Sequence, residues 1–110
     1  MKLWIDDVRP APEGYVWCKS VNDAYDRFHR QLGLFPEDEL LIDIDHDAGD
    51  YAWDGGDFIF LLKNLELCYH QDIKWKDYID NKVTFHIHSM NPVGVQNMRR
   101  IIQKNGWKEV

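Results

Sequence analysis

Short apolar runs alternate along this chain with segments of helical periodicity, and this alternation constrains the fold more than any other feature. Strands are predicted at 2–5, 15–18, 40–44 and 83–88, and residues 107–110 offer a short last strand. Apolar residues spaced three and four apart predict helices at 21–32, 58–69 and 92–104. Because helices join parallel strands by right-handed crossovers, the pattern predicts an α/β fold with a mainly parallel sheet of four or five strands.

The ends of these elements carry local signals. Ser20 can cap the first predicted helix, and Asn91 and Pro92 suit the N-cap and first position of the last one. The run 40–44 is continuously apolar up to Asp43, which is typical of a strand covered on both faces. Residues 70–82 carry a few apolar positions among polar ones, so they fit either a long connection or a short amphipathic helix.

Length and composition predict one soluble globular domain spanning residues 1–110. Hydrophobic residues make up 45% of the chain and charged residues 29%, which is the balance of a protein with a packed core. Asp6 and Asp7 interrupt the apolar stretch that a signal peptide would need, and the apolar run 58–62 is far too short to cross a membrane. We therefore expect a cytoplasmic protein with no membrane partner.

The formal net charge of −6 narrows the class of partners. Nucleic-acid backbones bind to clustered lysine and arginine side chains, so duplex DNA is not expected as a partner. A small phosphorylated ligand or an RNA end is compatible with this charge if a cation stands between its phosphate and the acids.

Aspartates follow two of the predicted strands. Asp6 and Asp7 come after the first strand, and Asp45 and Asp47 after the strand at 40–44. In open parallel sheets ligands bind beyond the carboxyl ends of the strands, and carboxylates gathered there repel one another unless a cation compensates them. Oxygen ligands favour Mg²⁺, with Mn²⁺ as a substitute, so all four aspartates are candidate metal ligands.

The alternative interpretation of these acids needs no metal. In it, Asp6 and Asp47 only cap loops and form ion pairs with Arg9. A solvated charged loop would explain one run of acids, but here aspartates follow two separate strands. This arrangement favours the metal site.

Histidines stand beside the acids. His86 and His88 are two residues apart on a predicted strand and so project to the same face. His88, closer to the strand end, can act as an acid or base with His46 as its partner across the neighbouring strand. The competing interpretation is a core histidine with satisfied hydrogen bonds, and we prefer it for His86 alone.

Residues around the last predicted helix suit a phosphate. Ser89 can donate a hydrogen bond to a phosphate oxygen, and Asn91 and Gly94 lie at a helix start whose free N–H groups favour anions. Arg9 either clamps the phosphate or neutralises Asp7. With His46 and His88, Ser89 completes the candidate catalytic residues.

Three segments resemble the cyclic-phosphate processing receiver-like domains: 3–10, 45–49 and 86–94, the last reading HIHSMNPVG. The resemblance extends from residue 1 to about residue 102. It implies a three-layer, flavodoxin-like receiver fold, with the receiver acidic pair at Asp6 and Asp7, the phospho-acceptor at Asp45 and the hydroxyl position at Ser89.

Two departures from the receiver pattern argue against phosphorelay signalling. A phosphorelay receiver needs a lysine after its fifth strand, and here Lys108 is poorly placed for that role. No helix is predicted between the first two strands.

Two functions follow. The first is a metal-assisted phosphoesterase acting on a cyclic phosphate of a nucleotide or RNA end, in which one histidine activates water and another protonates the leaving oxygen. The second is a noncatalytic, degenerate receiver module that binds phosphate, a metal or a protein partner.

Overall fold

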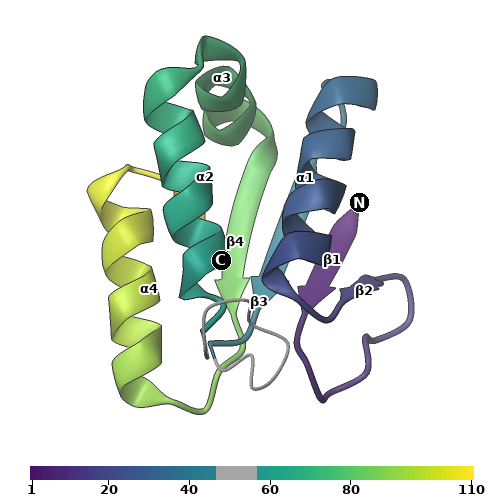
Figure 1. Ribbon diagram of the computed structural model, residues 1–110, viewed down its shortest axis with the longest axis vertical. Coiled ribbons are helices and arrows are strands. Elements are labelled where there is room, and N and C mark those ends of the chain that lie inside the picture. Colours follow the sequence, from purple (N-terminus) through teal and green to yellow (C-terminus); the bar gives the residue numbers. More distant parts are fainter. Residues whose placement is uncertain (47–56) are drawn as a thin grey trace.

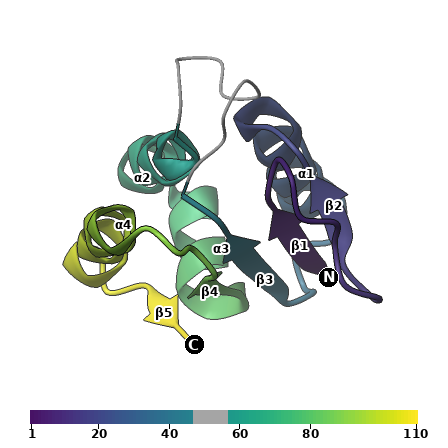
Figure 2. The same cartoon turned by 90° about the horizontal axis from the view of Figure 1, so that it is seen from below.

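Five parallel strands form the sheet in the computed structural model, which describes residues 1–46 and 57–110. Their order across the sheet is β2-β1-β3-β4-β5, with β1 to β4 labelled in Figure 1 and β5 in Figure 2. The strands are β1 (Lys2–Ile5), β2 (Val16–Cys18), β3 (Leu40–Ile44), β4 (Val83–Ile87) and β5 (Lys108–Glu109). The predicted α/β class and parallel sheet are therefore confirmed, including the short last strand.

In the part of the chain that the structure describes, four helices connect the strands: α1 (Val21–Leu34), α2 (Ile59–Gln71), α3 (Ile73–Lys82) and α4 (Pro92–Lys104). The predicted caps are confirmed for α1 and α4. Ser20 Oγ accepts a hydrogen bond from the Asp23 N–H at 3.0 Å, and Asn91 Oδ1 accepts one from the Gly94 N–H at 3.1 Å. No helix in the described residues is long and apolar enough to span a membrane.

The undecided segment 70–82 is mostly helical. Asp72 caps α3 by accepting a hydrogen bond from the Lys74 N–H at 2.9 Å. The helix then buries Trp75 and Tyr78 against Phe28 of α1, with ring centroids 5.0 and 5.7 Å apart. These aromatic contacts stabilise α3, whose short amphipathic pattern does not by itself distinguish a helix from a connection.

All four helices lie on one face of the sheet (Figure 2). Toward that face the strands direct fully buried side chains, among them Leu3, Ile42 and Phe85. The alternate positions of the same strands are exposed or half-buried, as at Lys2, Leu41 and His86. The described chain therefore has two layers where the resemblance implies three.

The missing layer has a topological cause. From β2 onward the crossovers advance in one direction across the sheet, so their right-handed connections all pass over the same face. Only the β1–β2 connection runs the other way, and it contains no helix. The strand 40–44 is buried at every position except Leu41, which is half-buried, as its continuous apolar run predicts. Helices cover one of its faces, and on the other face Asp43 is buried by a histidine, as described below.

Candidate functional site

Three aspartates meet where β1 and β3 end. Ile5 pairs with Ile44, so the residues after them emerge side by side, and the Asp45 N–H donates to the Ile5 carbonyl at 2.8 Å. One carboxylate oxygen from each of Asp6, Asp7 and Asp45 lies within 4.8 Å of the others. Three hard oxygen donors at this separation fit a divalent cation such as Mg²⁺. Asp47, the fourth predicted ligand, lies outside the described residues.

Asp6 is held rigidly as an ionised carboxylate. Its Oδ1 accepts hydrogen bonds from the backbone N–H groups of Val8 and Arg9, at 2.9 and 2.8 Å. Burial alone would raise the pKa of Asp6, but these two backbone bonds and the nearby His88 outweigh it and hold the pKa below its usual value. The Arg9 Nε lies 3.7 Å from Asp6 Oδ2, so the ion pair of the alternative interpretation is present.

His88 bridges two carboxylates. Its Nε2 lies 3.0 Å from Asp6 Oδ2, and its Nδ1 lies 2.6 Å from Asp43 Oδ1. The ring also stacks on Trp4 with centroids 3.8 Å apart and planes 4° from parallel. A neutral imidazole can donate from only one nitrogen, so donation to both carboxylates requires the protonated ring.

Asp43 is the site residue that the sequence prediction missed. It pairs with His86 in the register of β3 and β4, so it projects to the same face as His86 and His88. The signal was an acid at an alternating position of an otherwise apolar strand, two residues before Asp45. A buried carboxylate in such a strand needs a partner, and His88 supplies it.

His46 lies beside the first turn of α4. Its Nδ1 is 3.7 Å from Asp57 Oδ1 and 3.5 Å from Asn91 Nδ2. The ring also fills the space beside Gly94, where a Cβ atom would lie 2.3 Å from His46 Cγ. His46 thus contacts Asp57 and Asn91, whereas His88 contacts Asp6, Asp43 and Trp4.

The remaining predicted residues lie around this edge, with one exception. Ser89 Oγ accepts a hydrogen bond from the Asn91 N–H at 3.1 Å, which shapes the turn before α4 and leaves the hydroxyl proton available. His86, in contrast, is exposed, with Nδ1 2.7 Å from the Val110 carbonyl. The prediction of a core histidine at 86 is therefore wrong, because none of the described helices covers its face of the sheet.

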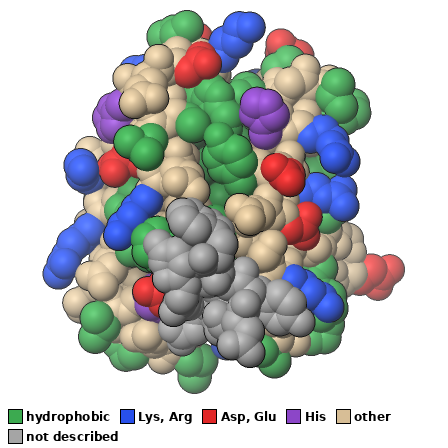
Figure 3. Space-filling view, in the orientation of Figure 1, with side chains coloured by type: hydrophobic (Ala, Val, Ile, Leu, Met, Phe, Trp, Pro, Cys, Tyr) green, Lys and Arg blue, Asp and Glu red, His purple; other side chains and the backbone are tan. Residues whose placement is uncertain are grey.

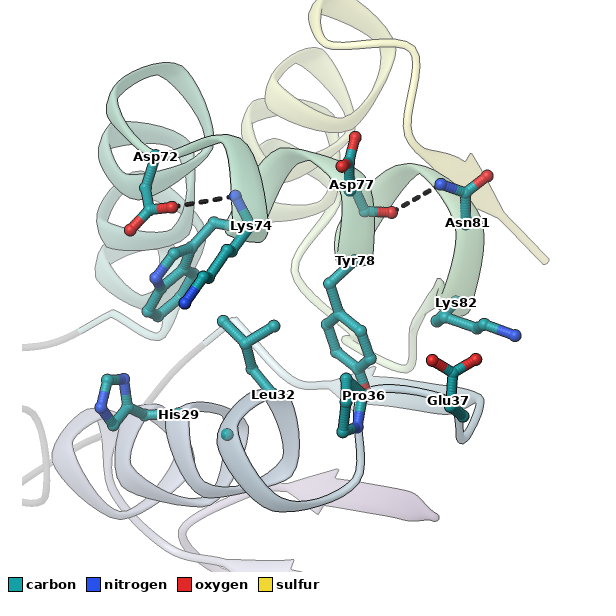
Figure 4. A pocket seen from close by; sticks show the side chains of 12 residues that line it. His29, Leu32, Pro36, Glu37, Asp72, Lys74, Asp77, Tyr78, Asn81 and Lys82 are labelled. Carbon is teal, nitrogen blue, oxygen red and sulfur yellow. Dashed lines mark hydrogen bonds between the residues drawn. The ribbon is translucent and has the colours of Figure 1, made fainter.

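A second concave region lies at the other end of the molecule. A cavity of about 670 Å³ opens between α1 and α3 (Figure 4). Leu32, Trp75 and Tyr78 line it, with charged side chains of both signs around them. It contains none of the predicted site residues, and no acid cluster of the kind described above is found there.

A comparison with protein-family models tests the family resemblance that the three sequence segments suggest. The model of the cyclic-phosphate processing receiver domain matches residues 1–104. The chain belongs to this family. No curated protein and no solved structure gives a significant match.

In this receiver domain Lys108 is poorly placed to hold a phosphoryl group, as the sequence predicts. Lys108 pairs with Thr84, near the start of β4, whereas the acid cluster lies beyond the ends of the strands. It also contributes to the electrostatic environment of Asp80, at the end of α3. Lys108 therefore cannot hold a phosphoryl group on Asp45.

Proposed function

We propose that this receiver domain hydrolyses a cyclic phosphodiester with the help of a divalent cation. The observation that carries the proposal is the cluster of Asp6, Asp7 and Asp45, whose oxygens lie within 4.8 Å of one another. When bound, Mg²⁺ would polarise the phosphoryl oxygens and neutralise developing charge. Membership of a cyclic-phosphate processing family supports the choice of substrate.

Hydrolysis of the ring needs two proton transfers. A water oxygen forms a bond to phosphorus, and its proton passes to a base. The bond between phosphorus and one ring oxygen breaks, and that oxygen keeps the electron pair and takes up a proton. We assign His46 as the base, because Asp57 Oδ1, 3.7 Å from its Nδ1, would hold the proton on Nδ1 and leave Nε2 to accept one from water. We assign His88 as the acid, because its Nε2 lies 3.0 Å from Asp6 Oδ2 at the acid cluster and would donate its proton to the leaving oxygen in place of Asp6.

Ser89 and Arg9 are proposed to bind the phosphate. The Ser89 hydroxyl and the exposed Arg9 guanidinium both have hydrogen-bond donors to offer. Asn91 and Gly94 act indirectly, since the first caps α4 and the second makes room for His46.

The test is turnover of 2′,3′-cyclic nucleotides by the purified protein with Mg²⁺. We expect phosphomonoester product from the wild type, and a loss of about 10²–10⁴-fold in His46→Ala. His29→Ala is the matched control, because His29 is an exposed histidine on α1 that lines the cavity at the other end of the molecule. Absence of turnover across several cyclic nucleotides, or equal activity in His46→Ala and the wild type, would contradict the proposal.

A noncatalytic receiver module is the second candidate. It is favoured by the engagement of both His88 nitrogens with Asp6 and Asp43, which leaves that ring no free nitrogen for substrate. Treatment with a small phosphodonor and Mg²⁺ separates the two functions by mass measurement. One phosphoryl group gained on Asp45, without turnover of cyclic nucleotides, would favour the module.

A further inference from the structure

The helix-free face of the sheet carries two rows of side chains in register. The row nearer the strand starts consists of Lys2, Leu41, Thr84 and Lys108. The next row consists of Trp17, Trp4, Asp43 and His86. Among them Lys2, His86 and Lys108 are exposed, and the two tryptophans are partly exposed. This face is therefore a surface of rings and cations.

Charge distinguishes this face from the rest of the molecule. The chain as a whole carries −6, and its helical face displays acids and bases together (Figure 3). On the helix-free face the strands present two exposed lysines, and their one acid, Asp43, is buried against His88. Lys19 adds a further cation at the edge, 4.3 Å above the Trp17 ring. Such a surface complements a negatively charged ligand with planar groups.

The surface is continuous with the acid cluster. Trp4 stacks on His88, and His88 contacts Asp6, so one line of contacts leads from the middle of the face to the candidate metal site. A ligand that lies across the face can thus place one end at the acids.

We propose that the helix-free face binds a short single strand of RNA whose 2′,3′-cyclic phosphate end enters the site of Asp6, Asp7 and Asp45. Sheets with surface aromatic residues bind two or three unpaired bases by stacking, and lysines hold the backbone. A 2′,3′-cyclic phosphate requires the ribose 2′-oxygen, which selects RNA over DNA. The placement of the end rests on the proposed function, whereas binding of the strand does not.

The test is fluorescence anisotropy with a labelled RNA trinucleotide, ending in either a cyclic phosphate or a free hydroxyl, in EDTA so that no metal-dependent hydrolysis occurs. We compare the wild type with Lys2→Gln/Lys108→Gln and with Trp17→Ala. Lys74→Gln is the control, since it removes an exposed lysine from α3 on the opposite face.

We expect both RNAs to bind the wild type and Lys74→Gln alike. Each lysine lost from the face should lower the slope of log affinity against log salt by about 0.7. Trp17→Ala should weaken binding by about fivefold or more. If Trp17→Ala does not fold, the lysine variant decides alone.

Three results would overturn the inference. They are no binding of either RNA, an unchanged salt slope in the double lysine variant, or an equal loss in Lys74→Gln. A wild-type dimer in sedimentation equilibrium that Lys2→Gln/Lys108→Gln converts to monomer would also overturn it, because the face would then be an interface between two copies. Binding of RNA without turnover of cyclic nucleotides would retain this inference and reject only the proposed hydrolysis.

Discussion

Gly94 lies where α4 meets the His46 ring, and no other residue fits there without rearrangement. A Cβ atom at position 94 would lie 2.3 to 2.5 Å from three atoms of the buried His46 ring. We expect Gly94→Ala to lower the free energy of unfolding by about 1–3 kcal/mol, because the ring must shift in a packed region. Urea denaturation measures this change, and the proposed hydrolysis should fall as well because the same shift displaces His46.

Gly33→Ala provides the matched control for that substitution. Gly33 also lies in a helix, but a Cβ there would meet nothing within 4 Å. Alanine should therefore stabilise the protein by about 0.5–1 kcal/mol through its higher helix propensity. Equal effects of the two substitutions would show that the contact between Gly94 and His46 is not tight.

At the same scale, the bridge between Asp43 and His88 should be measurable as a coupling. Both side chains are largely buried, so removing one leaves the other without its charged partner. In a double-mutant cycle with Asp43→Ala and His88→Ala, we expect a coupling free energy of about 0.5–3 kcal/mol in urea denaturation. A cycle of Asp43→Ala with His70→Ala, an exposed histidine on α2, should give a value near zero. Additive effects in the first cycle would exclude the bridge.

At the scale of elements, α3 is attached to α2 by a polar contact whose strength depends on pH. Asp80 accepts hydrogen bonds from the Tyr69 hydroxyl at 2.7 Å and from Lys76 Nζ at 2.8 Å. Burial alone would raise the pKa of Asp80, but these two bonds outweigh it and hold the pKa below its ordinary value.

The sign of the pH effect follows from that direction. A carboxylate whose pKa is lower in the folded state stabilises the fold fully above its unfolded pKa of about 3.9, and the contribution is lost as the pH falls through the folded pKa. We expect the urea midpoint of the wild type to fall more between pH 6 and pH 3 than that of Asp80→Asn. Asp77→Asn, a change at an exposed position on the same helix, should behave as the wild type. Parallel curves for Asp80→Asn and the wild type would contradict this role.

The elements also show which features the sequence could predict. Strands and caps followed from short-range signals such as Ser20 and Asn91, which act within three residues. The helix α3 could not be predicted from such signals, because its Trp75 and Tyr78 pack on Phe28, which is distant in the sequence. Asp43 escaped the site prediction for the same reason: its partner His88 is 45 residues away.

At the scale of the whole molecule, the order of the strands explains both what was predicted and what was not. The acids were expected to meet because parallel strands end at one edge, and Asp6, Asp7 and Asp45 do lie together there. The resemblance implies a helix layer on each face, whereas the sequence predicts no helix between the first two strands, and the β1–β2 connection indeed contains none. That absence turns His86 from an expected core residue into a surface residue.

The central claim is that distant parts of the chain form one cation site, and titration calorimetry with Mg²⁺ or Mn²⁺ tests it most directly. We predict one bound cation per chain, with affinity reduced at least about tenfold in Asp7→Asn and Asp45→Asn and unchanged in Asp77→Asn. No heat of binding for the wild type, or the same affinity in the wild type and Asp45→Asn, would contradict the account.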